Sequence, residues 1–437
     1  MDLPANRHVW RIAAPMMLSN ITVPLLGMVD TGVTGHLDDA VYLAAVAVGA
    51  TIFGILYTGV NFLRMGTTGI AAQRFGANDA DGVREALGQA AVVALLIAAL
   101  LLIVHRPLGQ FAVNLVAADA GISRWAYEYF AVRIWSAPAT LLNFALIGWF
   151  IGLQDARVPF LIMLVINLTN IALDILFVVF LGMKVAGVAA ASVLAEIAGL
   201  LVGLYFAARV LRTYGGSWQL DALMRPRRYR GFFAINAQLL VRTLALMFTF
   251  TFITAQGARL GGLVLAANAI LMNLQHLLSF ALDGIAHAAE ALVGRAIGAR
   301  DRAALQQAVR LSLRWSVLIA GGFSLLFIVG GPLFIRVMTD LPDVRATTLQ
   351  FLPWLVASPL ISTWSFLYDG VYVGATRARE MRDIMLVSTF GIFLPAWYLL
   401  QPLGNHGLWL AFLLFMASRG IGMHYYYKKR VAPLAGG

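Results

Sequence analysis

The stretch FALIGWFIGLQDAR (Phe144–Arg157) has a counterpart 222 positions later in the chain, FLYDGVYVGATRAR (Phe366–Arg379). A second pair of segments, QRFGANDADGVREALGQA (Gln73–Ala90) and RAIGARDRAALQQA (Arg295–Ala308), aligns at the same offset. The positions that match are Phe144 with Phe366, Gly148 with Gly370, Gly152 with Gly374, Arg157 with Arg379, Gly76 with Gly298 and Asp79 with Asp301. Gene duplication followed by fusion explains this pattern, so we expect two copies of one structural unit.

The composition around these repeats is that of a polytopic membrane protein. Of the 437 residues 60% are hydrophobic and only 12% are charged, and the mean hydropathy is +0.80. A soluble domain carries about 25% charged residues. Apolar runs of about 20 residues, the length that crosses a bilayer as a helix, recur along the whole chain. Because the bilayer offers no partners to the backbone, and the alternating pattern of a barrel is missing, we predict an all-α integral membrane protein.

Twelve candidate spans follow from the apolar runs. They cover residues 12–35, 41–70, 83–106, 122–152, 156–181, 185–210, 231–256, 262–292, 304–330, 346–374, 382–402 and 405–427. The segment Arg209–Arg230 is polar and basic, and it is the one linker-like stretch between them. We therefore predict an N-lobe at 1–210, a basic linker at 211–230, a C-lobe at 231–430 and a tail at 431–437. An even number of spans per copy keeps both copies in one orientation, so a pseudo-two-fold axis should relate the two six-helix lobes.

The net charge of +11 has a topological explanation. If both termini lie on one side of the membrane, that side holds 22 of the 32 Lys and Arg residues, the opposite side holds six, and four fall within spans. Basic residues gather on the cytoplasmic side of membrane proteins, so we expect both termini in the cytoplasm and no nucleic-acid partner. The N-terminal segment lacks a small-residue cleavage site, and we expect the first span to be retained.

Several kinds of chemistry lack their sequence patterns. There is no cysteine, the histidines do not cluster with carboxylates at metal-ligand spacing, and no G-x-x-x-x-G-K-[ST] motif occurs. No Ser/His/Asp arrangement is evident either. We therefore expect no enzyme activity, no metal site and no cofactor, and transport energy that comes from an ion gradient.

Polar residues that one copy has and the other lacks point to a local task in the first copy. Asp30, Asn170 and Asp174 lie within spans, and 222 positions later the chain has Phe252, Ile392 and Ala396. An aspartate in the middle of the membrane costs about 2.5–3.5 kcal/mol on the insertion scale. A cost of this size in one lobe indicates a function located in that lobe.

The spacing of these residues predicts one shared pocket. Asn170 and Asp174 are four apart and lie on one helix face. Asp30 and Asp174 fall at similar depth, in the outer half of the membrane, so adjoining helices would bring the two carboxylates together to load and release a proton. Pro24 precedes Asp30 by six residues and is a candidate hinge. Three alternatives remain open: a packing hydrogen bond for Asp174, a capping role for Asp30 and a static kink at Pro24.

The second copy has its own polar candidates. Asp283 and Glu290 lie seven apart on one span, and Asp369 lies in the tenth span. Arg242 in the seventh span is placed to neutralise one of them, either as a static ion pair or as part of a functional site. The Gly-x-x-x-Gly spacings at Gly148 and Gly370 favour close helix packing over ligand binding.

Taken together, these features resemble the multidrug and toxic compound extrusion (MATE) transporters. The motifs MVDTGVTGHL (28–37), FALDGIAHAAEALVGRAIG (280–298) and FLYDGVYVGATRARE (366–380) are similar to the DinF branch in particular. The resemblance implies a V-shaped bilobate fold of twelve helices and a monomer in the bacterial inner membrane. It also implies export of organic, often cationic and amphipathic compounds by proton or sodium antiport. By the same resemblance Asp30 is the protonation site, Asn170 and Asp174 complete the N-lobe site, and Ser192 stands where relatives commonly have threonine.

The seventh span separates the coupling alternatives. The NorM-type relatives use an acidic residue there for a C-lobe cation, and none occurs between Tyr229 and Gln256. We therefore expect a proton-coupled exporter, with sodium at the Asp30 and Asp174 pair as the alternative. A lipid-linked saccharide flippase is a further alternative, which would need a basic cavity for pyrophosphate. The substrate itself is not readable from the sequence.

Overall fold

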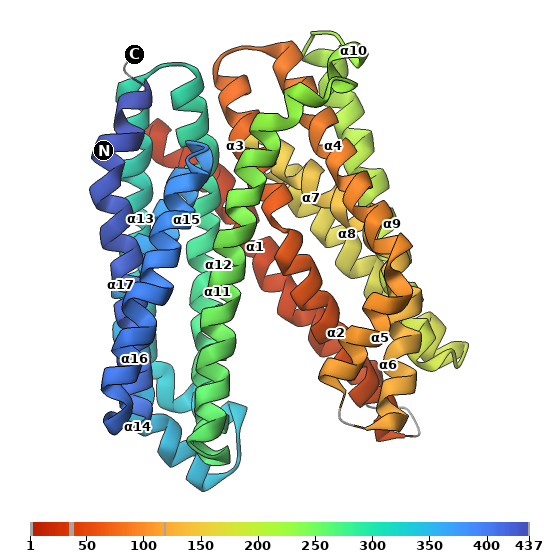
Figure 1. The fold of residues 1–437 in the computed structure, drawn as a ribbon, viewed down its shortest axis with the longest axis vertical. Helices are drawn as coiled ribbons and strands as arrows, with labels where there is room; N and C mark the ends of the chain where they lie inside the picture. The colour runs from red at the N-terminus through yellow and green to blue at the C-terminus, as the bar shows by residue number, and fades with distance from the viewer. Residues whose placement is uncertain (1–2, 35–38, 118, 436–437) are drawn as a thin grey trace. The chain divides into compact units, whose positions relative to one another are not determined.

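The computed structural model describes residues 3–34, 39–117 and 119–435, apart from the side chains of residues 3–4, 23–28, 30, 31, 34, 220 and 222. All regular secondary structure in the described part is helical. The helices of the first half are α1 (Leu3–Thr34), α2 (Ala40–Val60), α3 (Phe62–Gly76), α4 (Ala80–Ile103), α5 (His105–Val116), α6 (Ala120–Arg133), α7 (Ala137–Gly152), α8 (Arg157–Asp174) and α9 (Lys184–Thr213). Short helices in the linker include α10 (Leu220–Leu223). The second half has α11 (Arg230–Arg259), α12 (Gly262–Gly298), α13 (Arg302–Met338), α14 (Pro342–Gly374), α15 (Ala378–Leu386), α16 (Leu394–Leu400) and α17 (Asn405–Tyr426) (Figure 1).

The predicted membrane spans correspond to these helices. Eleven helical stretches in the described part of the chain are long and apolar enough to cross a membrane. They match the second to the twelfth predicted span, and α1 covers the first. The all-helical membrane fold is therefore confirmed. Helix α5 was not expected, because its 12 residues are too few to cross a bilayer and a search for spans passes over it.

The described chain divides into two compact units. One unit comprises Met1–Met17, Gly76–Asn78 and Phe233–Gly437, and the other comprises Leu18–Phe75 and Asp79–Phe232. We call them the C-terminal unit and the N-terminal unit. This division groups residues by their contacts and does not test the predicted bounds of the N-lobe and the C-lobe, which remain a prediction.

The core of the C-terminal unit is built on α12, α13, α14 and α17. Apolar side chains from these helices, among them Leu278, Phe327 and Phe412, are fully buried against one another. The start of α1 packs in the same unit, where Trp10 meets Trp315 edge to face at 5.0 Å between ring centroids. Such aromatic pairs add to the stability that comes from burying their area.

The N-terminal unit packs α4, α7, α8 and α9 around buried aromatic side chains. The Trp149 side chain on α7 is fully buried, and its indole nitrogen donates to the Val83 carbonyl on α4 at 2.9 Å. Helix α7 also packs against α8 and α9. Glycines allow some of these approaches, since a Cβ at Gly203 on α9 would lie 2.9 Å from Leu146 on α7.

The two units repeat the same local geometry at the sequence offset of 222. In the N-terminal unit Gly148 lies against the Arg64 carbonyl, and in the C-terminal unit Gly370 lies against the Ala286 carbonyl, each with no room for a side chain. The turns that follow also correspond, because Asn78 and Arg300 share a φ of 55°. The aspartate after each of these residues, Asp79 in one unit and Asp301 in the other, caps the next helix by accepting from a backbone nitrogen three residues on. The duplication is thus visible in backbone conformation, and the glycines lie at helix crossings as their spacing predicts.

Candidate functional site

Three of the predicted site residues meet inside the N-terminal unit. Asn170 and Asp174 on α8 are 1% and 0% exposed, and Ser192 on α9 is 7% exposed. With the Asn170 carboxamide oriented to satisfy both neighbours, its nitrogen donates to Asp174 Oδ2 at 3.0 Å and its oxygen accepts from Ser192 Oγ at 3.1 Å. The amide therefore bridges the carboxylate to the hydroxyl, and the three side chains form one buried polar cluster between two membrane helices.

Asp174 lies at a change in helix type. The α-helix α8 ends at this residue, and the chain continues as a π-helix over Ile175–Phe180. The Leu181 nitrogen donates to the Leu176 carbonyl at 3.0 Å, one residue further back than an α-helix allows. Wide turns of this type are found mostly as single insertions in α-helices, often at functional sites. The carboxylate is thus carried at the point where α8 loses its regular register.

A side-chain hydrogen bond joins helix α1 to helix α8 near this site. Asn167 Nδ2 on α8 donates to Thr22 Oγ1 on α1 at 2.6 Å. Both helices run in the same direction through the unit (Figure 1). Asp30 lies eight residues beyond Thr22 and Asp174 lies seven beyond Asn167, so at about 1.5 Å per residue the two aspartates fall at the same level. The side chains of Asp30 and Pro24 lie outside the described part, and their roles stay predictions.

A second polar cluster in the same unit, partly buried, contains an acid that the sequence analysis did not single out. Glu196 on α9 accepts from Asn143 Nδ2 on α7 at 2.9 Å. Tyr57 on α2 shares a 2.9 Å hydrogen bond with Ser136, and Thr140 connects Ser136 to this group at 3.4 Å. Arg133 on α6 supplies the nearby positive charge that acts on Glu196.

The two clusters of the N-terminal unit share one helix. Glu196 lies four residues after Ser192, so both side chains leave the same face of α9. That spacing, together with a glutamate inside an apolar span, is the signal that would have found Glu196 in the sequence. The polar face of α9 therefore reaches from the Asn170 and Asp174 cluster to a second carboxylate one turn further along.

The candidates of the C-terminal unit divide between two places. Asp369 on α14 accepts hydrogen bonds from both Arg242 on α11 and Arg419 on α17, the latter at 2.7 Å. Glu290 on α12 is 3% exposed, and its carboxylate lies 3.4 Å from the His287 ring. Arg419 is one of the four basic residues that fall within predicted spans, and nothing in the spacing shows which acid it meets.

The arginine cluster resembles a structural ion pair more than a binding site. One carboxylate faces two guanidinium groups that are almost fully buried, and Asp283 is close enough to act electrostatically on Arg419. The charges of these four residues balance. Among the described residues no group of three or more His, Asp or Glu side chains is arranged to hold a metal ion.

Comparison with known proteins identifies the family. The sequence model of the MatE family matches residues 15–176 and 239–399, which is most of the chain and falls in both copies of the repeat. The chain belongs to the MatE family. DNA damage-inducible protein F of Escherichia coli (strain K12) is 40% identical over 419 residues, covering 96% of this chain and 91% of that protein. Multidrug and toxin extrusion protein 1 of Homo sapiens is 24% identical over 419 residues, covering 92% of this chain and 71% of that protein.

Solved structures agree on the fold of this MatE chain. A crystal structure of MATE in the bent conformation matches it with a TM-score of 0.91 at 19% identity, over 98% of this chain and 96% of that one. A MOP superfamily transporter from Pyrococcus furiosus matches with a TM-score of 0.88 at 18% identity, over 98% and 96% of the two chains. At these identities the match establishes the fold alone. As a member of the MatE family the protein is a multi-pass membrane transporter and not an enzyme, as the sequence analysis predicted.

Proposed function

We propose that this transporter exports small organic compounds, often cationic and amphipathic, in exchange for protons. One observation carries the proposal: Asp174 is completely buried, bridged by Asn170 to Ser192, and level with Asp30 on the helix that Asn167 holds. Buried carboxylates in membrane helices commonly mark proton or ion pathways. The names of the relatives, which refer to multidrug and toxin extrusion, support organic compounds as substrates.

The coupling step uses the two aspartates as one unit. In this proposal the Asp30 and Asp174 carboxylates lie close together, so that two like charges share apolar surroundings and a proton on either of them removes one charge. Proton loading changes which partner the Asn170 amide meets, since its nitrogen faces a carboxylate and its oxygen faces the donor Ser192. In this proposal the altered contact between α8 and α1 bends α1 near Pro24 and expels the substrate, and proton release to the cytoplasm resets the site.

Glu196 extends the same negative surface toward an organic cation. Its carboxylate accepts one hydrogen bond from Asn143 and lies one helical turn from Ser192. A positively charged substrate bound in the N-terminal unit would be attracted by both Asp174 on α8 and Glu196 on the adjacent helix α9. Arg133 limits this attraction, because its positive charge lies near Glu196.

Sodium is the alternative coupling ion at the same residues. Carboxylate, amide and hydroxyl oxygens are the donors that hard cations prefer, and Asn170 would turn its oxygen toward such an ion. The same residues thus serve either ion, and only transport measurements separate them.

The flippase alternative receives no support from the arginines within the spans. Arg242 and Arg419 are engaged by Asp369, Arg64 bonds Asn61 at 3.3 Å, and Arg133 stands near Glu196. A pyrophosphate would need to displace these partners. We therefore retain the exporter as the proposed function.

The membrane orientation completes the proposal. The concentration of basic residues on one side supports a cytoplasmic position for both termini, and the similarity to the Escherichia coli relative supports the bacterial inner membrane. A proton that moves inward through 100 mV then releases about 2.3 kcal/mol for export.

The test is efflux of an organic cation from proteoliposomes under a pH gradient or a sodium gradient, each imposed alone. We expect the pH gradient to drive efflux and the sodium gradient to have no effect. Asp174→Asn and Asp30→Asn should abolish proton-driven efflux, whereas Asp343→Asn, at an exposed site in the first turn of α14, should not. Efflux driven by sodium alone, or wild-type efflux by Asp30→Asn, would overturn the assignment.

A further inference from the structure

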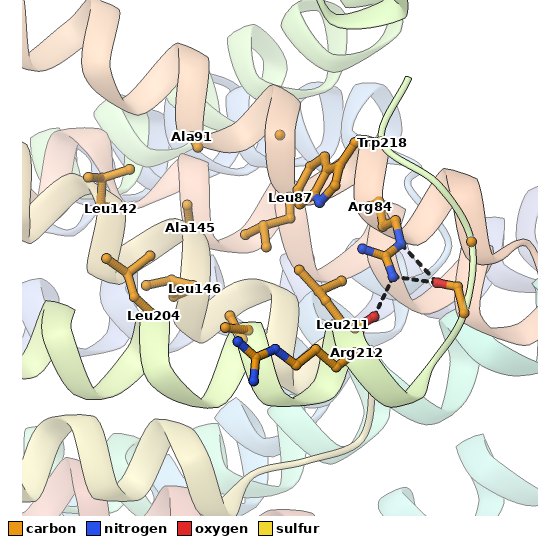
Figure 2. Close-up of a pocket in the computed structure, with 15 residues that line it drawn as sticks. Arg84, Leu87, Ala91, Leu142, Ala145, Leu146, Leu204, Leu211, Arg212 and Trp218 are labelled. Carbon is orange, nitrogen blue, oxygen red and sulfur yellow. Dashed lines mark hydrogen bonds between the residues drawn. The ribbon is translucent and has the colours of Figure 1, made fainter. Parts of the chain in front are cut away.

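A pocket of about 710 Å³ opens on the N-terminal unit, away from the carboxylate clusters. Figure 2 shows its lining, which comes from the first turns of α4, the middle of α7, the last turns of α9 and the linker. Helix α7 packs against both α4 and α9 and so forms the floor of the pocket between them. A volume of this size lies within the range of about 300–1,000 Å³ that is usual for ligand sites.

The walls of the pocket are apolar along most of its length. Leu87 on α4, Leu142 and Leu146 on α7, and Leu204 and Leu211 on α9 line it, together with several alanines (Figure 2). Leucines that are exposed on the same two outer helices, Leu95, Leu96 and Leu201, continue the apolar surface beyond the pocket. In a membrane protein such surfaces face acyl chains, so this surface joins the pocket to the lipid.

The end of the pocket next to the linker is basic. Arg84 on α4 is 7% exposed, and its Nε donates to the Gly215 carbonyl at 2.8 Å while its Nη2 bonds the Leu211 and Gly215 carbonyls. Its third nitrogen makes none of these bonds and lies on the side of the pocket, and Arg212 lines the pocket with an exposed side chain (Figure 2). Trp218 completes this end, with its ring centroid 5.8 Å from the Arg84 guanidinium carbon.

The linker is docked to α4 and gives this end a fixed shape. Asp81 accepts from the Ser217 nitrogen at 2.7 Å, and Glu85 pairs with Arg228 at 3.0 Å. Gly215 and Gly216 both have φ of +76°, a conformation that favours glycine and turns the chain toward α4. The docked linker and the helices around it thus hold two arginines at one end of an apolar groove.

We propose that this pocket binds an anionic glycerophospholipid, with an acyl chain between α4 and α9 and the head-group phosphate at Arg84 and Arg212. The argument is one of chemical match, because an amphipathic anion fits an apolar groove with a basic end near a membrane surface. Basic pockets between membrane helices on the cytoplasmic side bind lipid head groups elsewhere. An exported organic cation fits poorly, since two arginines would repel it. The inference is independent of the coupling ion.

The test is native mass spectrometry of the full chain with equal amounts of phosphatidylglycerol and phosphatidylcholine. We expect retention of phosphatidylglycerol adducts over phosphatidylcholine adducts. Arg212→Gln should reduce that preference about fivefold, the equivalent of about 1 kcal/mol per arginine at an anionic surface. The matched control is Arg227→Gln, which removes an exposed linker arginine outside the pocket and should leave the preference unchanged.

A second pair of variants tests the groove without changing charge. Ala208→Trp fills the pocket from an exposed position on α9, and Leu100→Trp places the same side chain at an exposed position on the opposite face of α4. Only the first should lose the tightly held lipid. Equal retention of both lipids, equal effects of Arg212→Gln and Arg227→Gln, or displacement of phosphatidylglycerol by an exported cation would each overturn the proposal.

Discussion

Asn167 on α8 donates a 2.6 Å hydrogen bond to Thr22 on α1, and this bond sets the relative height of two helices that each carry an aspartate. Thr22 in turn donates to the Ser19 carbonyl at 2.7 Å, so its hydroxyl is held on both sides. The bond lies two turns before Asp30 and Asp174. A change in α8 at the carboxylate can therefore reach α1 through a contact close by, and this contact is open to mutation.

Loss of the Asn167 bond should weaken coupling more than it weakens the fold. Asn167→Ala removes one buried hydrogen bond, which costs about 1 kcal/mol of stability. We expect proton-driven efflux to fall while the variant stays folded in the membrane, because α1 is no longer held to α8. Efflux in proteoliposomes and thermal stability in detergent measure the two effects. Thr22→Val removes the other partner and should have the same result, and normal efflux in both variants would contradict the role of this bond.

Glu196 should matter for cationic substrates and not for neutral ones. Glu196→Gln keeps the side-chain shape and an oxygen for the Asn143 bond but removes the charge. We expect weaker export of organic cations and unchanged export of a neutral substrate of similar size. Competition assays with a matched cationic and neutral pair measure the difference. Glu85→Gln, which loses a charge paired with Arg228 in the linker, is the control, and an equal loss for both substrates would point to a structural role for Glu196.

The Asp369 cluster should stabilise the C-terminal unit without a part in coupling. Removal of one partner from a buried ion pair costs about 3–5 kcal/mol, because it leaves an unmatched charge behind. Asp369→Asn should therefore lower the unfolding temperature strongly, while the protein that remains folded keeps the proton dependence of the wild type. Arg310→Gln, at an exposed site on α13, should change neither property. Loss of proton dependence in folded Asp369→Asn would place a second coupling site in this unit.

Equivalent glycines of the two repeats should respond alike. A methyl group at Gly148 or Gly370 meets a backbone carbonyl that no rotamer change can move away. We expect Gly148→Ala and Gly370→Ala each to destabilise the protein by about 1–3 kcal/mol, the usual cost of overpacking. Gly54→Ala and Gly321→Ala add the same group where no atom lies within 4 Å. These two should be neutral or stabilising by up to about 1 kcal/mol, since alanine favours a helix. Thermal unfolding of the four variants compares them directly.

Features that depend on the pattern along one helix were predictable from the sequence. Apolar runs gave the spans, and the four-residue spacing placed Asn170 and Asp174 on one face. The glycine spacing indicated close crossings, which the structure places at the same positions in both units. In each case the relevant physics acts within a few turns, so neighbours in sequence determine the outcome.

Features that depend on pairing between helices were not predictable. Glu196 meets Asn143 across 53 positions, and Arg419 meets Asp369 across 50 positions, and no local pattern specifies these partners. The sequence of the linker is polar and basic and names no partner, yet its carbonyls and charges are matched by residues of α4 such as Arg84. Helix α5 was passed over because it is short. The Asp30 side chain lies outside the described residues, and its proposed role rests on the level of its helix position.

The repeated glycine crossings show that the two copies share their helix packing but not their buried acidic residues. Both copies carry the close glycine contacts at their helix crossings, whereas the buried Asn170 and Asp174 pair occurs in the first copy alone. The ionisable groups of one half can thus be replaced during evolution without disturbing the helix crossings that stabilise that half. In this way an ancestral homodimer with acids in both subunits gives rise to an asymmetric descendant. One half of that descendant keeps the ion-coupling residues, and the other half is free to change its recognition of substrates.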